Sequence, residues 1–259
     1  MVWLLIYILV IPNLSWIKYQ TTVTFLDVGQ GDTTLIDSPN CTILIDTYGD
    51  IYTYLRTKHL DALDYLIITH GDYDHYKEVF TVMDHIAVDQ LIINAYESGQ
   101  FYDEIKNRYP YTKVSSGDEI RCGPIVLDVL GPIQAYSNKN NQSIVLKTYI
   151  NGTHYLFAGD IEVEAEKDLS EKYGTTLKSD ILKVPHHGSN TSSSLLFLNY
   201  VSPKIAVISA GRQNKFNHPH ESILKRYHEL GIQIYQTKLN YTITIASHRD
   251  KKYMVLVHK

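Results

Sequence analysis

The chain has 259 residues, of which 44% are apolar and 20% charged, so it can bury the core of one large domain or of two small ones. The formal net charge is −4. This excludes the global basic field of a stable DNA-binding module, but not an enzyme that holds phosphates through metal ions. Cys41 and Cys122 are too few for a zinc ribbon or a disulfide scaffold. We interpret them as two isolated buried thiols, with a single bridge between them as the alternative.

The chain begins with an apolar segment. Val2–Val10 is unbroken apolar, and Trp3 and Trp16 suit the two interfaces of a membrane. We interpret residues 1–20 as a membrane segment and residues 21–259 as one folded domain. A signal peptide is one alternative, but no positive residue precedes the run and no small-residue cleavage site follows it. A strand or helix of the core is the other.

Strands and helices alternate over the rest of the chain, and no low-complexity linker divides it. The predicted strands cover residues 23–28, 33–37, 42–46, 64–69, 90–94, 125–130, 143–150, 154–158, 180–184, 204–209, 233–236, 242–246 and 253–257. The predicted helices cover residues 51–59, 75–83, 101–108, 161–173, 192–200 and 221–230. This order favours sheets covered by helices in one compact domain.

A cluster of metal-ligand residues follows the predicted strand 64–69. His70, Asp72, Asp74 and His75 surround a glycine turn directly after that apolar run. Imidazole nitrogen and carboxylate oxygen are the ligands that borderline and hard divalent metals prefer. A polar surface turn is the alternative, but four ligand-type residues in this spacing favour a metal site. Ligands from one such loop can serve two ions about 3.5–4 Å apart.

Other ligand-type residues also stand just past predicted strands, namely Asp160, His186 and His218. Layered α/β proteins gather ligands in this way, from the ends of many strands along one edge. Each residue has an alternative interpretation: Asp160 can cap the helix that follows it, and His218 can be an ordinary loop residue.

Four motifs in series resemble those of the metallo-β-lactamase-fold hydrolases, and more narrowly the carboxy-terminal domain of ComEC-type DNA-internalisation (competence) proteins. The motifs are Phe25–Asp32, Thr69–His75, Gly159–Asp160 and Leu182–Ser189. The resemblance extends over residues 21–259. It implies an α/β (α+β) fold, a four-layer αββα sandwich with its metal site along one edge, preceded here by one N-terminal apolar helix.

The resemblance also implies roles for individual residues. His70 and Asp72 would bind a first metal, Asp74 and His75 a second, and Asp160 would bridge the two. The nucleophile would be the water between the metals, because metals lower its pKa towards about 7.

One histidine of the pair at 186 and 187 would complete the ligand set. Neighbours on an extended segment point in opposite directions, so we assign His186 as the ligand and His187 to the substrate or to support of the site. His218, which precedes a proline, would contact the scissile phosphate. Asp46 matches a position that supports the ligands from behind.

Two departures from the wider superfamily bear on the metal. Histidine is usual where this chain has Asp72, and another histidine is usual between the first ligand motif and Asp160, where this chain has Asn141 and Ser143. More oxygen ligands favour harder ions. We therefore expect two divalent metal ions, with Mn²⁺ and Zn²⁺ as the main candidates. The oxygen-rich ligand set favours a harder ion, such as Mn²⁺ or Mg²⁺, over Zn²⁺.

The predicted function is that of a membrane-anchored, metal-dependent phosphodiesterase that cuts DNA during competence DNA uptake. Expected partners are DNA as substrate, the membrane through residues 1–20, and other DNA-uptake components. Full-length ComEC proteins carry a multi-pass channel ahead of this domain, so we expect a detached last segment and hydrolase domain without channel function. The resemblance favours the outer face of the cell membrane, whereas Lys18 favours the inner face. The alternatives are a hydrolase of a small ester, lactone or cyclic nucleotide, and a non-catalytic remnant of a DNA-uptake protein.

Overall fold

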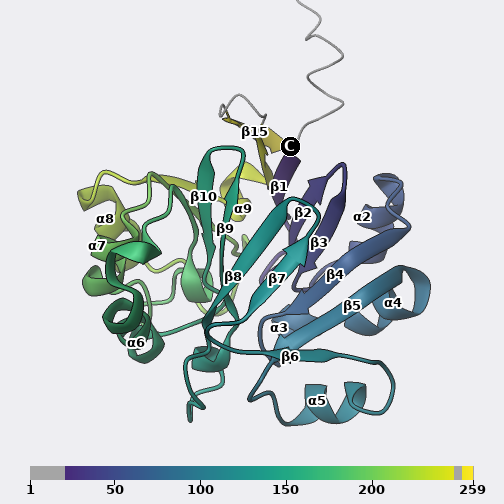
Figure 1. Ribbon diagram of the computed structural model, residues 1–259. Helices are drawn as coiled ribbons and strands as arrows, with labels where there is room; N and C mark the ends of the chain where they lie inside the picture. The colour runs from purple at the N-terminus through teal and green to yellow at the C-terminus, as the bar shows by residue number, and fades with distance from the viewer. Residues whose placement is uncertain (1–20, 248–252, 259) are drawn as a thin grey trace, which may run out of the picture.

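Two β-sheets packed face to face form the centre of the computed structural model, which describes residues 21–247 and 253–258 (Figure 1). The first sheet has the strand order β15-β14-β1-β2-β3-β4-β5-β6, and the second has the order β13-β12-β11-β10-β9-β8-β7. The strands of the first sheet are β1 (Thr21–Phe25), β2 (Thr34–Ser38), β3 (Cys41–Ile45), β4 (Ala62–Ile68), β5 (Ala87–Asn94), β6 (Thr112–Val114), β14 (Thr242–Ser247) and β15 (Tyr253–His258). Those of the second sheet are β7 (Glu119–Cys122), β8 (Ile125–Gly131), β9 (Val145–Ile150), β10 (Thr153–Phe157), β11 (Ile181–Lys183), β12 (Ile205–Ile208) and β13 (Gln233–Gln236).

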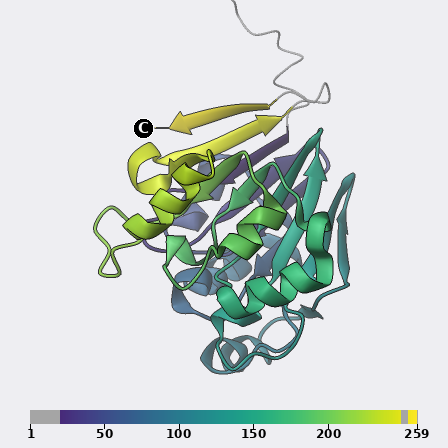
Figure 2. The ribbon, with the colours of Figure 1, turned by 90° about the vertical axis from the view of Figure 1, so that its left-hand side faces the viewer.

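Helices cover the outer face of each sheet (Figures 1 and 2). The first sheet is covered by α2 (Ile51–Thr57), α3 (Tyr73–Tyr76), α4 (Val79–His85) and α5 (Gln100–Ile105). The second is covered by α6 (Val163–Tyr173), α7 (Leu195–Val201) and α8 (Glu221–Glu229). The short helix α9 (Thr237–Asn240) connects β13 to β14, and three short 3-10 turns occupy Asn140–Gln142, Gly174–Leu177 and Pro185–Gly188.

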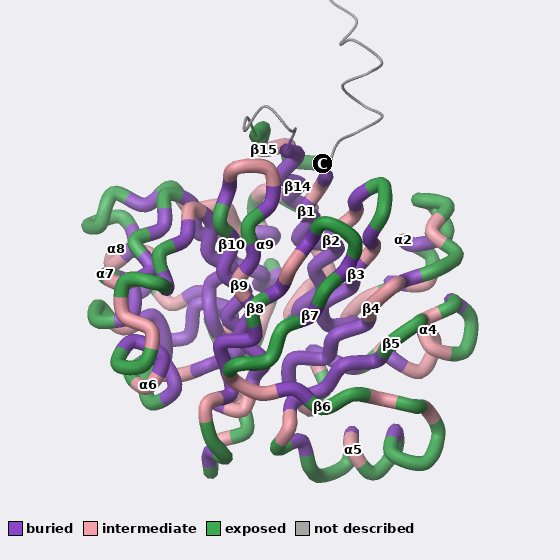
Figure 3. The backbone as a smooth tube through the Cα atoms, viewed as in Figure 1, coloured by how far each residue is buried: buried purple, intermediate pink, exposed green. Residues whose placement is uncertain are grey.

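The layers follow from strands that are apolar on both faces. On β3, Ile43 and Ile45 pack between the two sheets, whereas Leu44 packs against the helices. On β12, Val207 faces the inner core and Ala206 the outer one. Because successive side chains alternate, an unbroken apolar run contributes to both cores, and much of each central strand is buried (Figure 3). The predicted αββα sandwich is therefore confirmed.

Three predictions about individual elements need correction or fall outside the structure. The helix predicted at 75–83 is two helices, because the backbone N–H of Glu78 donates to the carbonyl of Thr47 instead of continuing the helix (2.9 Å). The edge strands β6 and β7 were missed because they are short and at least half of their residues are polar or charged and exposed. The N-terminal apolar helix at residues 1–20 lies outside the described residues. Within 21–247 and 253–258, no helix combines the length and apolar character needed to cross a membrane.

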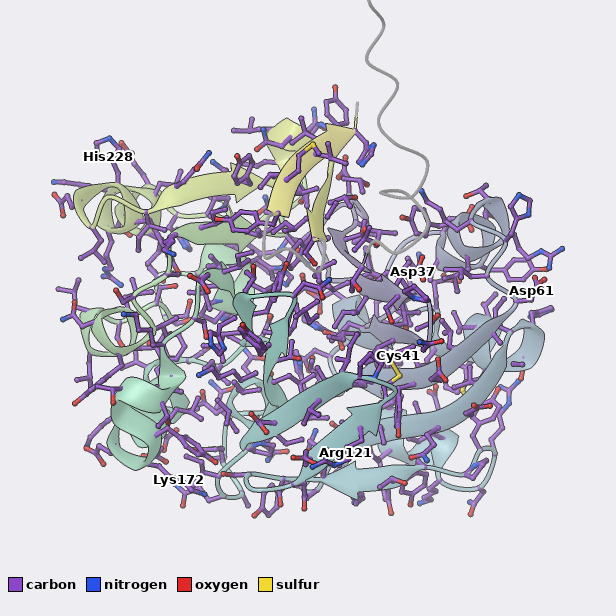
Figure 4. The ribbon with its side chains drawn as sticks, turned by 45° about the horizontal axis from the view of Figure 1, so that its top comes forward. Asp37, Cys41, Asp61, Arg121, Lys172 and His228 are labelled. Carbon is purple, nitrogen blue, oxygen red and sulfur yellow. A yellow bond between two sulfur atoms is a disulfide. The ribbon has the colours of Figure 1, made fainter. Side chains whose placement is uncertain are left out.

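The cysteines form a disulfide, so their interpretation as isolated thiols was wrong. Cys41 on β3 and Cys122 on β7 are bonded, with their Cα atoms 5.4 Å apart (Figure 4). Both are buried in the core between the sheets. The bond joins an edge strand of the second sheet to a central strand of the first. Packing of the two sheets creates this proximity across 81 positions of sequence, and no local sequence pattern reports it.

One edge of the sandwich receives the loops that carry the predicted ligands. Strands β3 to β6 run parallel in the first sheet, and β10 to β13 run parallel in the second. The carboxyl ends of parallel strands lie at one edge of a sheet, where α/β proteins place their sites. The segments after β4, β10, β11 and β12 therefore meet at this edge.

Candidate metal centre

His75, on α3, is held from behind by a carboxylate. Its Nδ1 lies 2.8 Å from Asp46 Oδ2, and Asp46 Oδ1 accepts a hydrogen bond from the Thr69 backbone N–H (2.8 Å). Asp46 follows β3 directly, so two neighbouring strand ends fix this pair. An Nδ1–H bond to a carboxylate leaves Nε2 as the free nitrogen, as in metal-binding histidines. His75 Nε2 faces Asp160 Oδ2 at 3.3 Å.

His187 reaches the same point from the second sheet. Its Nδ1 lies 3.0 Å from the Ser209 carbonyl oxygen, and its Nε2 lies 3.4 Å from Asp74 Oδ2 and 3.3 Å from Asp160 Oδ2. The Ser209 carbonyl thus orients this imidazole as Asp46 orients His75.

The structure brings His187 to this centre, not His186, which we had assigned as the ligand. His186 Nδ1 lies 3.2 Å from Thr191 Oγ1 and 3.2 Å from Glu162 Oε1. The two residues are not extended: their φ angles are 49° and 52°, in the left-handed region. The alternation rule for strands therefore gave no guide to which ring turns inward.

Asp160 lies between the two histidines. It follows β10 and is buried, and its backbone N–H donates to Ser143 Oγ (3.0 Å). A single oxygen, Oδ2, lies 3.3 Å from both His75 Nε2 and His187 Nε2. The segments after β4, β10 and β11 therefore deliver ligand atoms to one point.

Two residues of this centre were missed by the sequence analysis. Asp32, which follows the glycine-containing turn after β1, lies with Oδ2 4.0 Å from His75 Nε2. Lys183, the last residue of β11, pairs with Asp32 and lies 3.9 Å from Asp160 Oδ1. Both are buried. In the sequence analysis Asp32 appears only as the last residue of the motif Phe25–Asp32 and is given no role of its own, although it stands past a strand as the other ligands do.

His70 and Asp72 lie beside this centre. The His70 and His75 rings are 4.2 Å apart, and His70 Nε2 lies 3.8 Å from Asp72 Oδ2. Asp72 has 45% of its side chain exposed, whereas His70 is buried. Ser143 Oγ lies 3.2 Å from His70 Nδ1. An ion bound on this side would therefore have one imidazole and one half-exposed carboxylate as its ligands.

The Asn141 side chain makes its hydrogen bonds elsewhere and not to His70 or Asp72. Its Oδ1 accepts from the Glu162 backbone N–H (2.7 Å) and its Nδ2 donates to Glu164 Oε2 (3.1 Å). The amide therefore ties the loop before β9 to the start of α6. These two hydrogen bonds give the Asn141 amide a structural role that needs no metal.

The donor set fits a divalent cation. One ligand atom from each of Asp32, His75, Asp160 and His187 lies within 4.8 Å of all the others. Among the described residues, the Nε2 atoms of both histidines and Oδ1 of both aspartates have no hydrogen-bond partner. Buried polar atoms without partners are costly, and a cation bound at this point would satisfy the two imidazole nitrogens.

The same charges shift the pKa values of these groups. Burial lowers the pKa of His75, but Asp160 and Asp46 outweigh it and hold that pKa well above its usual value. Burial is likewise outweighed at His187, whose pKa is raised by Asp160 and Asp32. Burial raises the pKa of Asp74, but the nearby His187 and His75 together outweigh it and lower that pKa to about 2. The acidic cluster therefore favours any positive charge placed among its members.

His218 borders the centre without joining it. The centroid of its ring lies 6.2 Å from that of His187. Its Nδ1 is buried and has no hydrogen-bond partner among the described residues. Burial, with the nearby His187 and His186, lowers its pKa to about 4, so it is neutral near pH 7. A neutral imidazole there can donate one hydrogen bond.

The chain matches the Metallo-beta-lactamase superfamily over residues 26–212 and belongs to it. A solved structure with the same fold is the metallo-beta-lactamase fold protein YhfI from Bacillus subtilis. It has a TM-score of 0.62 and 11% identity, and the match covers 86% of this chain and 99% of that one. Together with the donor set, this membership defines a metal-dependent hydrolase of the metallo-β-lactamase fold.

Its relatives include proteins named for competence. ComE operon protein 3 of Bacillus subtilis (strain 168) is 30% identical over 260 residues, covering 85% of this chain and 32% of that protein. Competence protein ComA of Neisseria gonorrhoeae is 31% identical over 228 residues, covering 85% of this chain and 31% of that protein. The chain therefore spans about a third of the length of these relatives.

Proposed function

We propose that this chain is a metal-dependent phosphodiesterase that cuts DNA and that it serves DNA uptake. The observation that carries the proposal is the convergence of His75, Asp160 and His187 on one buried point at the edge of the sandwich, with the partly exposed Asp74 beside it. The names of the competence relatives support the connection to DNA uptake. Because the chain is acidic overall, its hold on phosphate rests on the metal centre and on local contacts.

Each residue of the centre has a proposed role that follows from its position. His75, His187 and Asp160 would hold a divalent ion, with Asp74 beside His187 and Asp32 behind. The ion would supply Lewis-acid chemistry and lower the pKa of a water. Asp46 and the Ser209 carbonyl fix both imidazole tautomers, so that Nε2 is free. Lys183 keeps a positive charge between Asp32 and Asp160. His218, with its unpartnered Nδ1, is proposed to contact the scissile phosphate.

We further propose that the domain works on the outer side of the cell membrane, with residues 1–20 as its anchor. The Cys41–Cys122 disulfide supports this side, because disulfides persist in oxidising compartments.

A second candidate is hydrolysis of a small ester, lactone or cyclic nucleotide at the same centre. A cavity of about 490 Å³ that includes Asp74 favours it, because this volume is typical of small-molecule sites. The convergence of the ligands opposes the third alternative, a non-catalytic remnant.

The test uses the 259-residue chain, stripped with chelator and reloaded with Mn²⁺ or Zn²⁺ in turn. Linear single- and double-stranded DNA and a small aryl phosphodiester are the substrates. Asp74→Ala is the inactive variant, and Asp103→Ala, an exposed aspartate on α5, is the matched control. We expect metal-dependent DNA cleavage that Asp74→Ala abolishes and Asp103→Ala retains. Cleavage of the aryl ester with DNA left intact would overturn the nuclease proposal in favour of the small-substrate hydrolase.

A further inference from the structure

A cavity of about 490 Å³ opens beside the metal centre, and the proposed chemistry does not use it. Gln30 and Tyr48 line it from loops of the first sheet, and Tyr73 and Asp74 line it from α3. Residues 213–216 line it from the loop after β12 of the second sheet. Asp74 belongs both to this cavity and to the metal centre. A phosphate at the centre would therefore have its neighbouring groups at the mouth of this cavity.

Exposed aromatic rings line the cavity. Tyr73 is 60% exposed and Phe216 is 47% exposed, although a large aromatic side chain gains stability from burial. Each half of the cavity pairs a ring with a cation: Lys215 Nζ lies 5.0 Å from the Phe216 ring centroid, and Lys77 Nζ lies 5.2 Å from that of Tyr48. Aromatic faces with nearby cations are the usual platform for bases of an unpaired strand.

The loop that carries Phe216 is braced rather than loose. Asn214 Oδ1 accepts from the His218 backbone N–H, and Asn214 Nδ2 donates to the carbonyls of Gly211 and His218, each at 2.8 Å. The Gly211 N–H donates to Gln30 Oε1 (3.1 Å), which ties this loop to the opposite sheet. Phe216 is therefore held out on a closed loop, which projects from the body of the molecule (Figure 2).

A series of rings connects the centre to this cavity. The His187 and His218 rings are 6.2 Å apart with a 23° angle between their planes, and the His218 and Phe216 rings are 5.6 Å apart with the same angle. Two nearly parallel steps thus lead from a proposed metal ligand to the cavity. A planar ligand that stacks on Phe216 would continue the series.

We propose that this cavity is a nucleobase-stacking subsite, in which one unpaired base packs against Tyr73 and Phe216 while its phosphodiester lies at the metal centre. The proposal rests on the proposed nuclease function and names the part of the DNA that the site recognises. The base is recognised by its π-face, so the subsite accepts any base. A base inside a duplex is stacked on both faces, so it must leave the duplex to enter.

The test is equilibrium binding, which does not depend on cleavage. Fluorescence anisotropy is measured with a labelled oligothymidylate joined by phosphorothioates, and with the same backbone lacking its bases. Both strands are measured with the metal-stripped and the Mn²⁺-loaded chain. We expect the base-containing strand to bind more tightly by roughly 5- to 150-fold per stacked base.

Variants locate the effect. Phe216→Ala and Tyr73→Ala should each reduce the preference for bases while leaving binding of the abasic backbone unchanged, and Phe216→Trp should restore it. Tyr149→Ala is the matched control, because Tyr149 is 51% exposed on β9 and does not line this cavity. Equal binding of the two strands by the unaltered chain, or binding of neither, overturns the subsite.

The two proposals fail separately. Metal-dependent DNA cleavage without any preference for bases would overturn the subsite and leave the nuclease standing. A preference for bases that Phe216→Ala removes, in a chain that never cuts DNA, would retain the subsite and overturn the nuclease.

Discussion

His75 and His187 combine full burial with raised pKa values, which makes metal binding a proton exchange. Because the folded-state pKa values are raised, the protonated imidazoles stabilise the metal-stripped chain below about pH 6.5. That stabilisation is lost as the pH rises through the folded-state values. A metal at Nε2 must displace these protons, so stabilisation by metal should grow with pH.

The measurement is the melting temperature with and without saturating Mn²⁺, from about pH 6 to about pH 8. Titration calorimetry in two buffers of different ionisation enthalpy counts the released protons. We expect release on binding and a metal-induced shift that increases with pH. A shift that is constant over this range would contradict the proposed ligands.

Lys183 yields a second prediction, since it is a buried cation between two buried carboxylates. Lys183→Met removes the charge that compensates Asp32 and Asp160, and loss of one partner of a buried pair typically costs about 3–5 kcal/mol. A divalent ion at the centre would replace part of that charge. The loss, measured by urea unfolding, should therefore be smaller with Mn²⁺ than with chelator.

Lys172→Met is the control for this variant, because that lysine is also cationic but is exposed, and it hydrogen-bonds the half-buried Ser116. It should lower stability little, and equally in both conditions. If Lys183→Met were equally destabilising with and without metal, the centre would not bind a cation near Asp32 and Asp160.

At the scale of single residues, the sequence predicted those site residues that lie close together along the chain or just past a strand. His70, Asp72, Asp74 and His75 were found because one short loop carries them, and Asp160 because it stands past a strand. Asp32 and Lys183 join the centre only because the ends of β1 and β11 meet across the two sheets. The choice between His186 and His187 depended on left-handed backbone angles, which their two identical side chains do not indicate.

At the scale of elements, a buried carboxylate connects helix α6 to the segment that follows His187. Glu166 accepts hydrogen bonds from the backbone N–H groups of Ser193 and Ser194, the latter at 2.7 Å. Glu166→Ala leaves the buried Ser193 N–H and the half-buried Ser194 N–H without this partner, and a buried unpaired donor costs about 1–3 kcal/mol. We expect a lower free energy of unfolding, and faster hydrogen exchange at the two serine amides. Glu171→Ala, which removes an exposed carboxylate from the same helix, should change stability by less than about 1 kcal/mol.

Secondary-structure elements, like site residues, were predicted where the signal is local in the sequence, and missed where tertiary contacts decide. Strands β1 to β5 and β8 to β15 were predicted within three residues of their observed bounds, because apolar, aromatic or β-branched residues mark them in the sequence. The edge strands β6 and β7 are short and partly exposed, so they carry little periodic signal. The break between α3 and α4 is set by Thr47, a tertiary partner that helix propensity does not include.

At the scale of the whole molecule, the two sheets are joined by one covalent bond. The Cys41–Cys122 disulfide closes a loop across 81 positions, and chain-entropy estimates for a loop of that length give about 4.5 kcal/mol of stabilisation. Reductant should therefore lower the urea midpoint of the unaltered chain. The Cys41→Ser/Cys122→Ser variant should show this lower urea midpoint even without reductant.

The same double variant is the control, because reductant should leave its midpoint unchanged. Alkylation of the unreduced, unfolded chain followed by mass spectrometry tests the bond directly. Two alkylated thiols in chain secreted to an oxidising compartment would contradict the disulfide. The bond lies between β3 and β7, whereas the ligands follow the strand ends β4, β10 and β11. Reduction should therefore weaken the packing of the sheets before it disturbs metal binding, and Mn²⁺ affinity in mild reductant should stay within about two-fold of the oxidised value.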